Sequence, residues 1–200
     1  MFRKAEILSR IELRQSTIKD WLSCPLMFRF CHVLQLAPSY RSLAAIHGSA
    51  LHLCIHRLHR GGFDLDLGLL YARALEEVLE SESHIPIRWK KGIDEDRLIM
   101  KTHAEEILQG YVHHEQNRTS TLMYSEAKFR VRVSGMMLTG TIDQVRRNMD
   151  STLELIDLKS GMQRPLKRAL QRDWQLNLYA YALRYGEIFI HSSWVRIRMK

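Results

Sequence analysis

The spacing of apolar residues changes near Thr119, from mostly helical before this point to alternating after it. Helical spacing predicts helices near residues 16–32, 42–60, 67–81 and 94–117. Beyond the break, Phe129, Val131 and Val133 alternate with polar residues, which predicts a strand. The chain is therefore expected to have a helical first part and a second part built around a sheet.

The second part contains further strand patterns and one more helix. Ser134-Gly135 predicts a turn, and the apolar patterns predict strands over 136–145, 153–158 and 187–197 and a helix near 166–185. Two hundred residues, of which 46% are apolar, can bury a substantial core. We expect an α/β protein with a single domain over residues 1–200, in which residues 1–118 form the helical part and residues 119–200 the sheet.

Two acidic residues and a lysine fall on neighbouring strands of the predicted sheet. Side chains alternate along a strand, so Asp157 and Lys159 are expected to share one face, while Ile156 and Leu158 point the other way. The polar residues between 146 and 152 predict a turn, which allows antiparallel pairing and brings Asp143 beside Asp157. The result would be a hairpin that carries two carboxylates and an amine.

Two adjacent carboxylates repel each other, and a bound cation offsets that repulsion. Oxygen ligands favour Mg²⁺ or Mn²⁺ over Zn²⁺, and such ions commonly bind substrate phosphate oxygens. An ammonium group beside the metal can orient the attacking water and offset charge on the phosphorus. This pattern predicts phosphodiester chemistry with Asp143, Asp157 and Lys159 as the catalytic residues.

The same residues resemble the core of the PD-(D/E)XK nuclease superfamily, and more specifically its RecB-like branch. The matching motifs are Gly140-Thr-Ile-Asp143, Asp157-Leu-Lys159-Ser-Gly161, Gln175-Leu-Asn-Leu-Tyr179, Gly48-Ser-Ala-Leu-His52, and the Cys24-Pro25 and aromatic pattern between Ser16 and Phe30. Each motif alone has low specificity, but their joint order is specific. The resemblance implies a restriction-endonuclease-like fold, with a central mixed sheet flanked by helices.

The resemblance also implies roles for individual residues. His52, Asp143 and Asp157 would be metal ligands, with the carbonyl of Leu158 as a further ligand. Gln175 and Tyr179, one helical turn apart, would position the substrate or support Lys159. The alternative for these two is ordinary helix packing, and the alternative for His52 is a hydrogen-bonded core histidine.

Glu126 is a second-tier metal ligand in this interpretation, because it lies just before the strand that Phe129 indicates. A zinc site is a further alternative, since His52, His56 and His59 fall near one helical face. No acidic or cysteine partner completes that site at suitable spacing.

Three cysteines, Cys24, Cys31 and Cys54, are too few for the four thiolates of an iron-sulfur cluster. Some RecB-like nucleases hold such a cluster, but here none is expected, and Cys24 is expected to pack as a small buried hydrophobe. An odd, sparse cysteine set favours a reducing, intracellular setting, which we expect to be the cytoplasm. The resemblance implies a bacterial or phage-encoded protein. No stretch is apolar enough for a membrane span or a secretory signal, so no membrane partner is expected.

A formal net charge of +8 and an isoelectric point near 9.6 suit a polyanionic partner. Positive charge near the acidic motifs comes from Arg146, Arg147, Arg164, Lys167, Arg168 and Arg172. The expected partner is DNA, single-stranded or with free ends, which these residues contact through phosphates. A solvated helix face is the alternative explanation of the basic residues.

The leading hypothesis is a Mg²⁺- or Mn²⁺-dependent deoxyribonuclease, an exonuclease of DNA processing, repair or recombination. The alternative is a nucleic-acid-binding assembly subunit with the nuclease fold, whose cleavage is weak or depends on a partner. A structure-specific or RNA-directed endonuclease of the same fold is a third possibility. A helicase, a recombination factor or a second copy of the chain is the expected protein partner.

Overall fold

The computed structural model describes residues 13–160, 174–190 and 192–196. They form two compact units. The first unit contains residues 13–37, Leu122–Asp157 and the described residues from 174 onward, and the second contains Pro38–Thr121 and residues 158–160. The change from helical to alternating spacing near Thr119 therefore falls close to a boundary between the units. The N-terminal segment, residues 13–37, nevertheless belongs to the first unit and not to the helical one.

The second unit consists of three long helices and a small two-stranded parallel sheet. Its elements are β1 (Arg41–Ser42), α4 (Leu43–Gly61), α5 (Leu67–Ser81), β2 (Ile87–Arg88) and α6 (Ile93–Gln116). Side-chain caps start two of the helices, because the Ser42 and Asp66 side chains accept hydrogen bonds from the N–H groups of Ala45 and Leu69. The three helices lie close to the predicted ranges, so the helical patterns are confirmed.

The helices of this unit pack around an apolar core and also enclose a polar contact. Ile46, Leu58 and Leu108 are completely buried in that core. His47, also buried, places Nδ1 2.7 Å from the Tyr71 hydroxyl and Nε2 3.1 Å from Nδ1 of His103. His47 therefore bonds on both ring nitrogens while remaining in the core.

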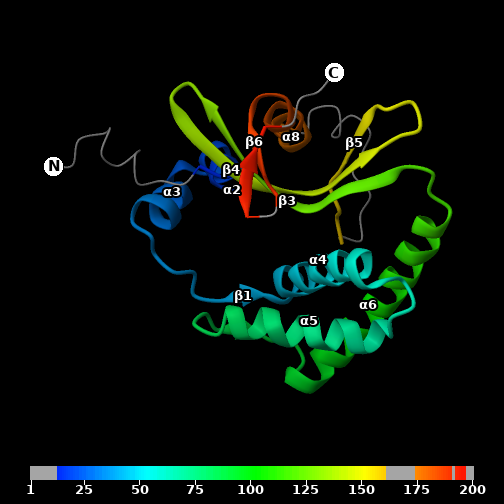
Figure 1. Cartoon of the computed structure of the whole chain (residues 1–200). Coiled ribbons are helices and arrows are strands. Elements are labelled where there is room, and N and C mark those ends of the chain that lie inside the picture. The colour runs from blue at the N-terminus through cyan, green and yellow to red at the C-terminus, as the bar shows by residue number, and fades with distance from the viewer. Residues whose placement is uncertain (1–12, 161–173, 191, 197–200) are drawn as a thin grey trace. The chain divides into compact units, whose positions relative to one another are not determined.

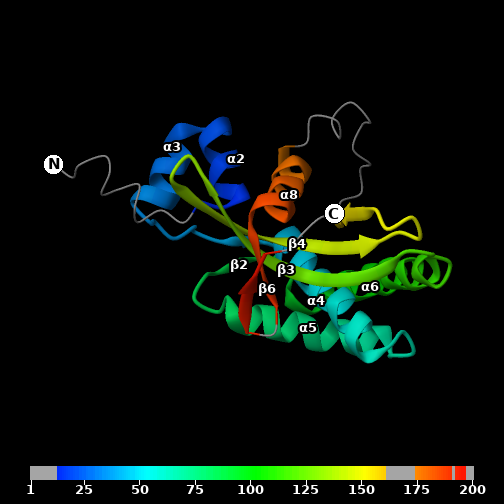
Figure 2. The same cartoon turned by 45° about the horizontal axis from the view of Figure 1, so that its top comes forward.

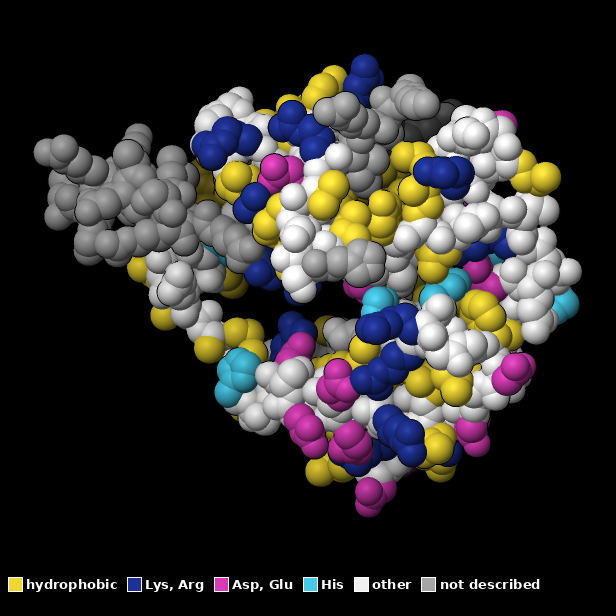
Figure 3. All heavy atoms as spheres, viewed as in Figure 1, with side chains coloured by type: hydrophobic (Ala, Val, Ile, Leu, Met, Phe, Trp, Pro, Cys, Tyr) yellow, Lys and Arg dark blue, Asp and Glu magenta, His cyan; other side chains and the backbone are white. Residues whose placement is uncertain are grey.

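Ion pairs connect the outer surfaces of the same helices. Arg57 pairs with Glu77 across α4 and α5, and Arg97 pairs with Glu76 at 2.8 Å across α6 and α5. Figure 3 shows basic and acidic side chains interspersed on the visible face of the helices. Much of the positive charge in this unit is therefore balanced locally.

The first unit is built on a five-stranded sheet with the order β5-β4-β3-β6-β7 (Figure 1). The strands are β3 (Thr121–Val133), β4 (Met136–Arg147), β5 (Leu153–Ile156), β6 (Glu187–Ile190) and β7 (Ser193–Val195). A two-residue turn joins β3 and β4, with Ser134 at φ 48° and Gly135 at φ 84°, as expected for a tight hairpin. The predicted turn is confirmed.

The α/β class is confirmed, but the sheet differs from the mixed sheet that was expected. The pairs β4–β5, β3–β6 and β6–β7 are antiparallel, and the β3–β4 hairpin is as well. Among the described residues of this sheet, parallel pairing is limited to one bridge between Leu13 and Leu138. Short connections make the β3–β4, β4–β5 and β6–β7 pairs antiparallel, because parallel neighbours need a long crossover.

Helix α8 (Trp174–Tyr185) lies over the sheet, and α2 (Gln15–Ser23) lies beside β4 (Figures 1 and 2). Phe129 and Tyr179 meet edge to face, with ring centroids 5.8 Å apart. The buried side chains of Val131, Ile142 and Leu183 belong to the same cluster. This packing fixes α8 against the strands that carry the candidate catalytic residues.

The single helix expected near 16–32 is divided into α2, the short α3 (Pro25–Phe28) and a π-helical turn, η1 (Arg29–Val33). Cys24 precedes a proline and adopts an extended backbone, with φ −156°, which interrupts the helix. The prediction that Cys24 is buried was wrong. Its side chain is exposed, and its Sγ accepts a hydrogen bond from the Met27 N–H at 3.5 Å.

Two further differences concern the C-terminal part. The single strand expected over 187–197 is a hairpin of β6 and β7. The start of the helix expected near 166–185 lies outside the described residues, as do Gly161 and the basic residues Arg164, Lys167, Arg168 and Arg172. No helix among the described residues is long and apolar enough to cross a membrane.

Acid should weaken the second unit through His47. Burial, together with the neighbouring His103, lowers the pKa of His47 from 6.5 to about 4. Between these values the unfolded chain binds more protons than the folded chain, so the free energy of unfolding should fall as pH falls from about 6.5 to about 4, by up to about 3 kcal/mol. Urea unfolding at pH 7 and pH 5 measures this loss, which should be smaller in His47→Gln. The control is His84→Gln, at an exposed position. If both variants lose the same free energy of unfolding between pH 7 and pH 5, the assignment to His47 is contradicted.

Gly140 should tolerate no side chain. A Cβ at Gly140 would lie 2.8 Å from two ring atoms of Phe129, which is 1% exposed and has little room to move. We expect Gly140→Ala to lower the free energy of unfolding by about 1–3 kcal/mol. Gly110→Ala is the matched control, because no atom within 4 Å meets the added methyl group in helix α6. That substitution should raise stability by about 0.5–1 kcal/mol.

Candidate active site

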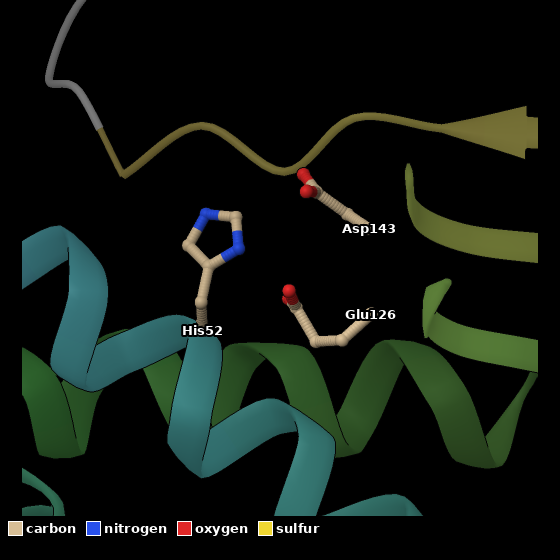
Figure 4. Close-up of side chains that lie close together, drawn as sticks. All are labelled: His52, Glu126 and Asp143. Atoms are coloured by element: carbon tan, nitrogen blue, oxygen red, sulfur yellow. The ribbon is translucent and has the colours of Figure 1, made fainter. Parts of the chain in front are cut away.

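Glu126 on β3 and Asp143 on β4 present their carboxylates to the same side (Figure 4). Their nearest ligand oxygens lie within 4.8 Å of each other. Asp143 is 8% exposed, so its charge is largely shielded from water. Two carboxylates at this separation can share one cation.

Glu126 has an unusual backbone for a strand residue. Its φ is +53°, in the left-handed region that residues other than glycine rarely adopt. Such strain is often stored at functional sites, where it redirects a side chain. The prediction that Glu126 precedes the strand was wrong, because β3 begins at Thr121.

Asp157 lies beside Asp143 through the register of β4 and β5. Gln144 pairs with Ile156, so one further step places Asp143 opposite Asp157. The ladder ends at this step, as expected where like charges would stand opposite each other. The register therefore leads both acidic residues to the same end of the β4–β5 pair, and the charges of both act on Tyr179.

The strand geometry assumed for Asp157 and Lys159 was wrong. Strand β5 ends at Ile156, and residues 157–160 have no regular secondary structure. The alternation that was expected to place Asp157 and Lys159 on one face therefore does not apply to them.

Helix α8 contributes a buried amide that contacts Asp157. Gln175 Nε2 donates hydrogen bonds to Asp157 Oδ1 at 2.7 Å and to the Tyr179 hydroxyl oxygen at 2.6 Å. Its Oε1 accepts a hydrogen bond from Gln15 Nε2 at 2.8 Å. Gln175 is 8% exposed, and its amide has partners in α2, in α8 and at Asp157. The helical spacing that predicted a shared face for Gln175 and Tyr179 is confirmed.

Tyr179 reports on the electrostatics of this region. Burial raises its pKa to about 12, the hydrogen bond from Gln175 opposes the rise, and the charges of Asp143, Asp157 and Glu126 add to it. The hydroxyl is therefore neutral at ordinary pH, beside three carboxylates. Such concentrated negative charge favours a bound cation.

The remaining candidate residues belong to the second unit. His52 lies half-buried on α4 and is labelled in Figure 4. Leu158 packs against the helical core of that unit, and Lys159 is exposed. A Cβ at Gly48 would lie 3.4 Å from Ser160 Oγ, so the start of the Gly48–His52 motif lies beside the segment that contains Lys159.

The histidines show why the zinc alternative lacks support. His59 Nε2 lies 2.6 Å from the Tyr111 hydroxyl and 3.8 Å from Glu115 Oε2. In the described part of the chain, no group of three metal-ligating side chains includes His56 or His59.

Arg146 also differs from expectation, because it is 4% exposed and donates to Gln144 Oε1 at 3.2 Å, so it is not a surface phosphate ligand.

The Gln175 amide should contribute measurably to stability. Gln175→Met keeps the size of the side chain but leaves buried polar partners without their hydrogen bonds. We expect it to lower the free energy of unfolding by about 1–3 kcal/mol in urea titrations. Gln116→Met, at an exposed position of α6, should change stability by less than about 0.5 kcal/mol. Equal effects of the two substitutions would show that the Gln175 bonds contribute nothing.

Comparison with known proteins identifies the family of the chain. No curated protein matches the chain. Residues 12–193 match the PD-(D/E)XK nuclease superfamily, a span that includes the acidic residues, Lys159 and the Gln175–Tyr179 pair. Members of this superfamily hydrolyse phosphodiester bonds with the help of divalent metals. The chain therefore belongs to the PD-(D/E)XK nuclease superfamily.

Proposed function

We propose that this protein is a DNA nuclease dependent on Mg²⁺ or Mn²⁺, of the RecB-like branch, that degrades strands from an end. The observation that carries the proposal is the close pair of Glu126 and Asp143 carboxylates, with Asp157 bonded to Gln175 and all three charges acting on Tyr179. A role in DNA processing, repair or recombination follows from the same resemblance.

The distribution of charge supports a nucleic acid substrate. Residues 38–121 contain 10 Lys and Arg against 12 Asp and Glu, whereas the whole chain contains 30 against 22. The positive excess therefore lies outside the helical unit, in the parts of the sequence that surround the acidic motifs. Basic residues near an acidic metal cluster can bind the phosphates on either side of the cleaved bond.

The donor set suits a hard divalent cation. Carboxylate oxygens of Glu126, Asp143 and Asp157 match the preferences of Mg²⁺ and Mn²⁺, and thiolates are not part of the set. We assign His52 and the Leu158 carbonyl as further ligands, from the motifs they occupy. A divalent ion bound there would polarise the phosphate and lower the pKa of the attacking water.

The residues of the chain then have separate tasks. Gln175 holds Asp157 in place through its amide, and Tyr179 adds no charge because its hydroxyl stays protonated. The ammonium group of Lys159 orients the water and offsets negative charge that develops on the phosphate oxygens. Tyr179 and Gln175 also face the substrate strand in this assignment.

Cleavage should depend on the acidic cluster and on Lys159. With 5′-labelled linear single-stranded DNA and Mg²⁺ or Mn²⁺, we expect Asp143→Asn, Asp157→Asn and Lys159→Ala to lower the rate at least about 100-fold, because each removes a charge from the reacting centre. EDTA should abolish cleavage. His52→Ala should raise the metal concentration needed for half-maximal activity.

Asp150→Asn is the matched control, since Asp150 lies exposed in the turn between β4 and β5. Its cleavage rate should equal that of the wild type. Closed circular DNA should resist cleavage, and its degradation would identify an endonuclease. Binding of DNA without cleavage in either metal would favour an assembly subunit instead.

A further inference from the structure

A cavity of about 530 Å³ lies within the first unit, and most of its lining belongs to no site described above. The first turn of α2, strands β3 and β4, Tyr179 of α8 and Trp194 of β7 line it. Binding cavities for small organic molecules commonly have volumes of roughly 300–1,000 Å³. The space is therefore sufficient for a nucleotide.

The polar lining favours an anion. Arg14 and Lys128 line the cavity, as do the hydroxyl-bearing residues Ser16, Thr139 and Thr141, and none of the described lining residues is acidic. The nine-residue helix α2 begins at the cavity, so its positive N-terminal end adds to the potential. Cations and hydroxyl groups together are the usual partners of phosphate oxygens.

An aromatic ring stands in the same cavity. Trp194 is 37% exposed, and the centre of the Arg130 guanidinium lies 4.5 Å from its ring centroid. Arg130 Nε donates to Glu187 Oε2 at 2.6 Å, which fixes the guanidinium against the β6–β7 hairpin. Arg130 covers one face of this ring and the Phe189 ring lies 5.3 Å from it between centroids, so a nucleic acid base can stack on the ring surface that these two side chains leave exposed.

The cavity lies next to the acidic cluster. Thr139, Thr141 and Asp143 follow one another at alternate positions of β4, and each two-residue step spans about 7 Å. Tyr179 lines the cavity and also accepts the hydrogen bond from Gln175, which in turn holds Asp157. A strand cleaved at the acidic cluster would place a neighbouring nucleotide in this space.

We propose that the cavity binds the nucleotide adjacent to the cleaved bond, with its phosphate at Arg14 and Lys128 and its base against Trp194. This inference rests on the proposed function and specifies how that site selects its substrate. The phosphate can belong to a strand end or to an internal linkage, and both present the same oxygens to the two cations.

The parent protein for this experiment is the Asp143→Asn variant, so that binding is measured without cleavage. The probe is an oligonucleotide of ten thymidines labelled at its 3′ end, and its fluorescence anisotropy gives Kd. We expect Lys128→Gln and Arg14→Gln each to raise Kd at least about fivefold. Arg132→Gln is the matched control, because Arg132 is an exposed cation on the same strand that does not line the cavity. Its Kd should change less than about twofold.

Trp194 separates base stacking from charge. Trp194→Ala should raise Kd at least about fivefold, whereas Trp194→Phe, which keeps an aromatic face, should stay within about threefold of the parent. Circular dichroism of each variant shows whether its fold is retained. The inference is wrong if Arg132→Gln weakens binding as much as Lys128→Gln, or if folded Trp194→Ala binds like the parent.

The source of the phosphate is identified with unlabelled competitors. Preference for a 5′-phosphorylated strand over 5′-hydroxyl and circular strands assigns the cavity to a strand end, and equal competition by all three assigns it to an internal linkage. Either result supports the cavity as a nucleotide site. If the parent and Lys128→Gln show the same preference among the three competitors, the proposal is contradicted. Failure of the nuclease proposal gives a different result. In that case the wild-type protein binds DNA through these residues but does not cleave it.

Discussion

The repulsion among Glu126, Asp143 and Asp157 is the constraint on which the sheet-bearing unit depends. Glu126 and Asp143 place ligand oxygens within 4.8 Å of each other, and the charge of Asp157 acts with theirs on Tyr179. The Gln175 amide compensates for part of this cost, because it donates to Asp157 and is itself held by Gln15. A buried polar network of this kind stabilises one arrangement only when every member has a partner.

The acidic cluster also explains features of the surrounding backbone. The β4–β5 ladder ends where Asp143 and Asp157 would pair, and the segment with Lys159 leaves the sheet at that point. Glu126 adopts a left-handed conformation within β3. These irregularities occur at residues to which the proposed function gives catalytic roles, and functional chemistry commonly overrides ideal sheet geometry.

The second unit supports its helices in a different way. Its core is apolar around the His47–Tyr71–His103 contact, and ion pairs on its surface balance much of its charge. The positive excess of the chain therefore resides in the sequence around the sheet. In the proposed function, the sheet-bearing unit contributes the carboxylates of Glu126, Asp143 and Asp157.

Local periodicity in the sequence determined the long helices, the β3–β4 hairpin, the antiparallel pairing of β4 with β5 and the shared helical face of Gln175 and Tyr179, because these depend on residues close in the chain. The ordered motifs likewise determined the superfamily. Tertiary structure alone decided the break at Cys24, the conformation of Glu126 and the burial of Arg146. It alone also brought Arg14, Lys128 and Trp194 to one cavity, since packing between distant segments sets burial, backbone strain and the shape of a cavity, and no local pattern records that packing.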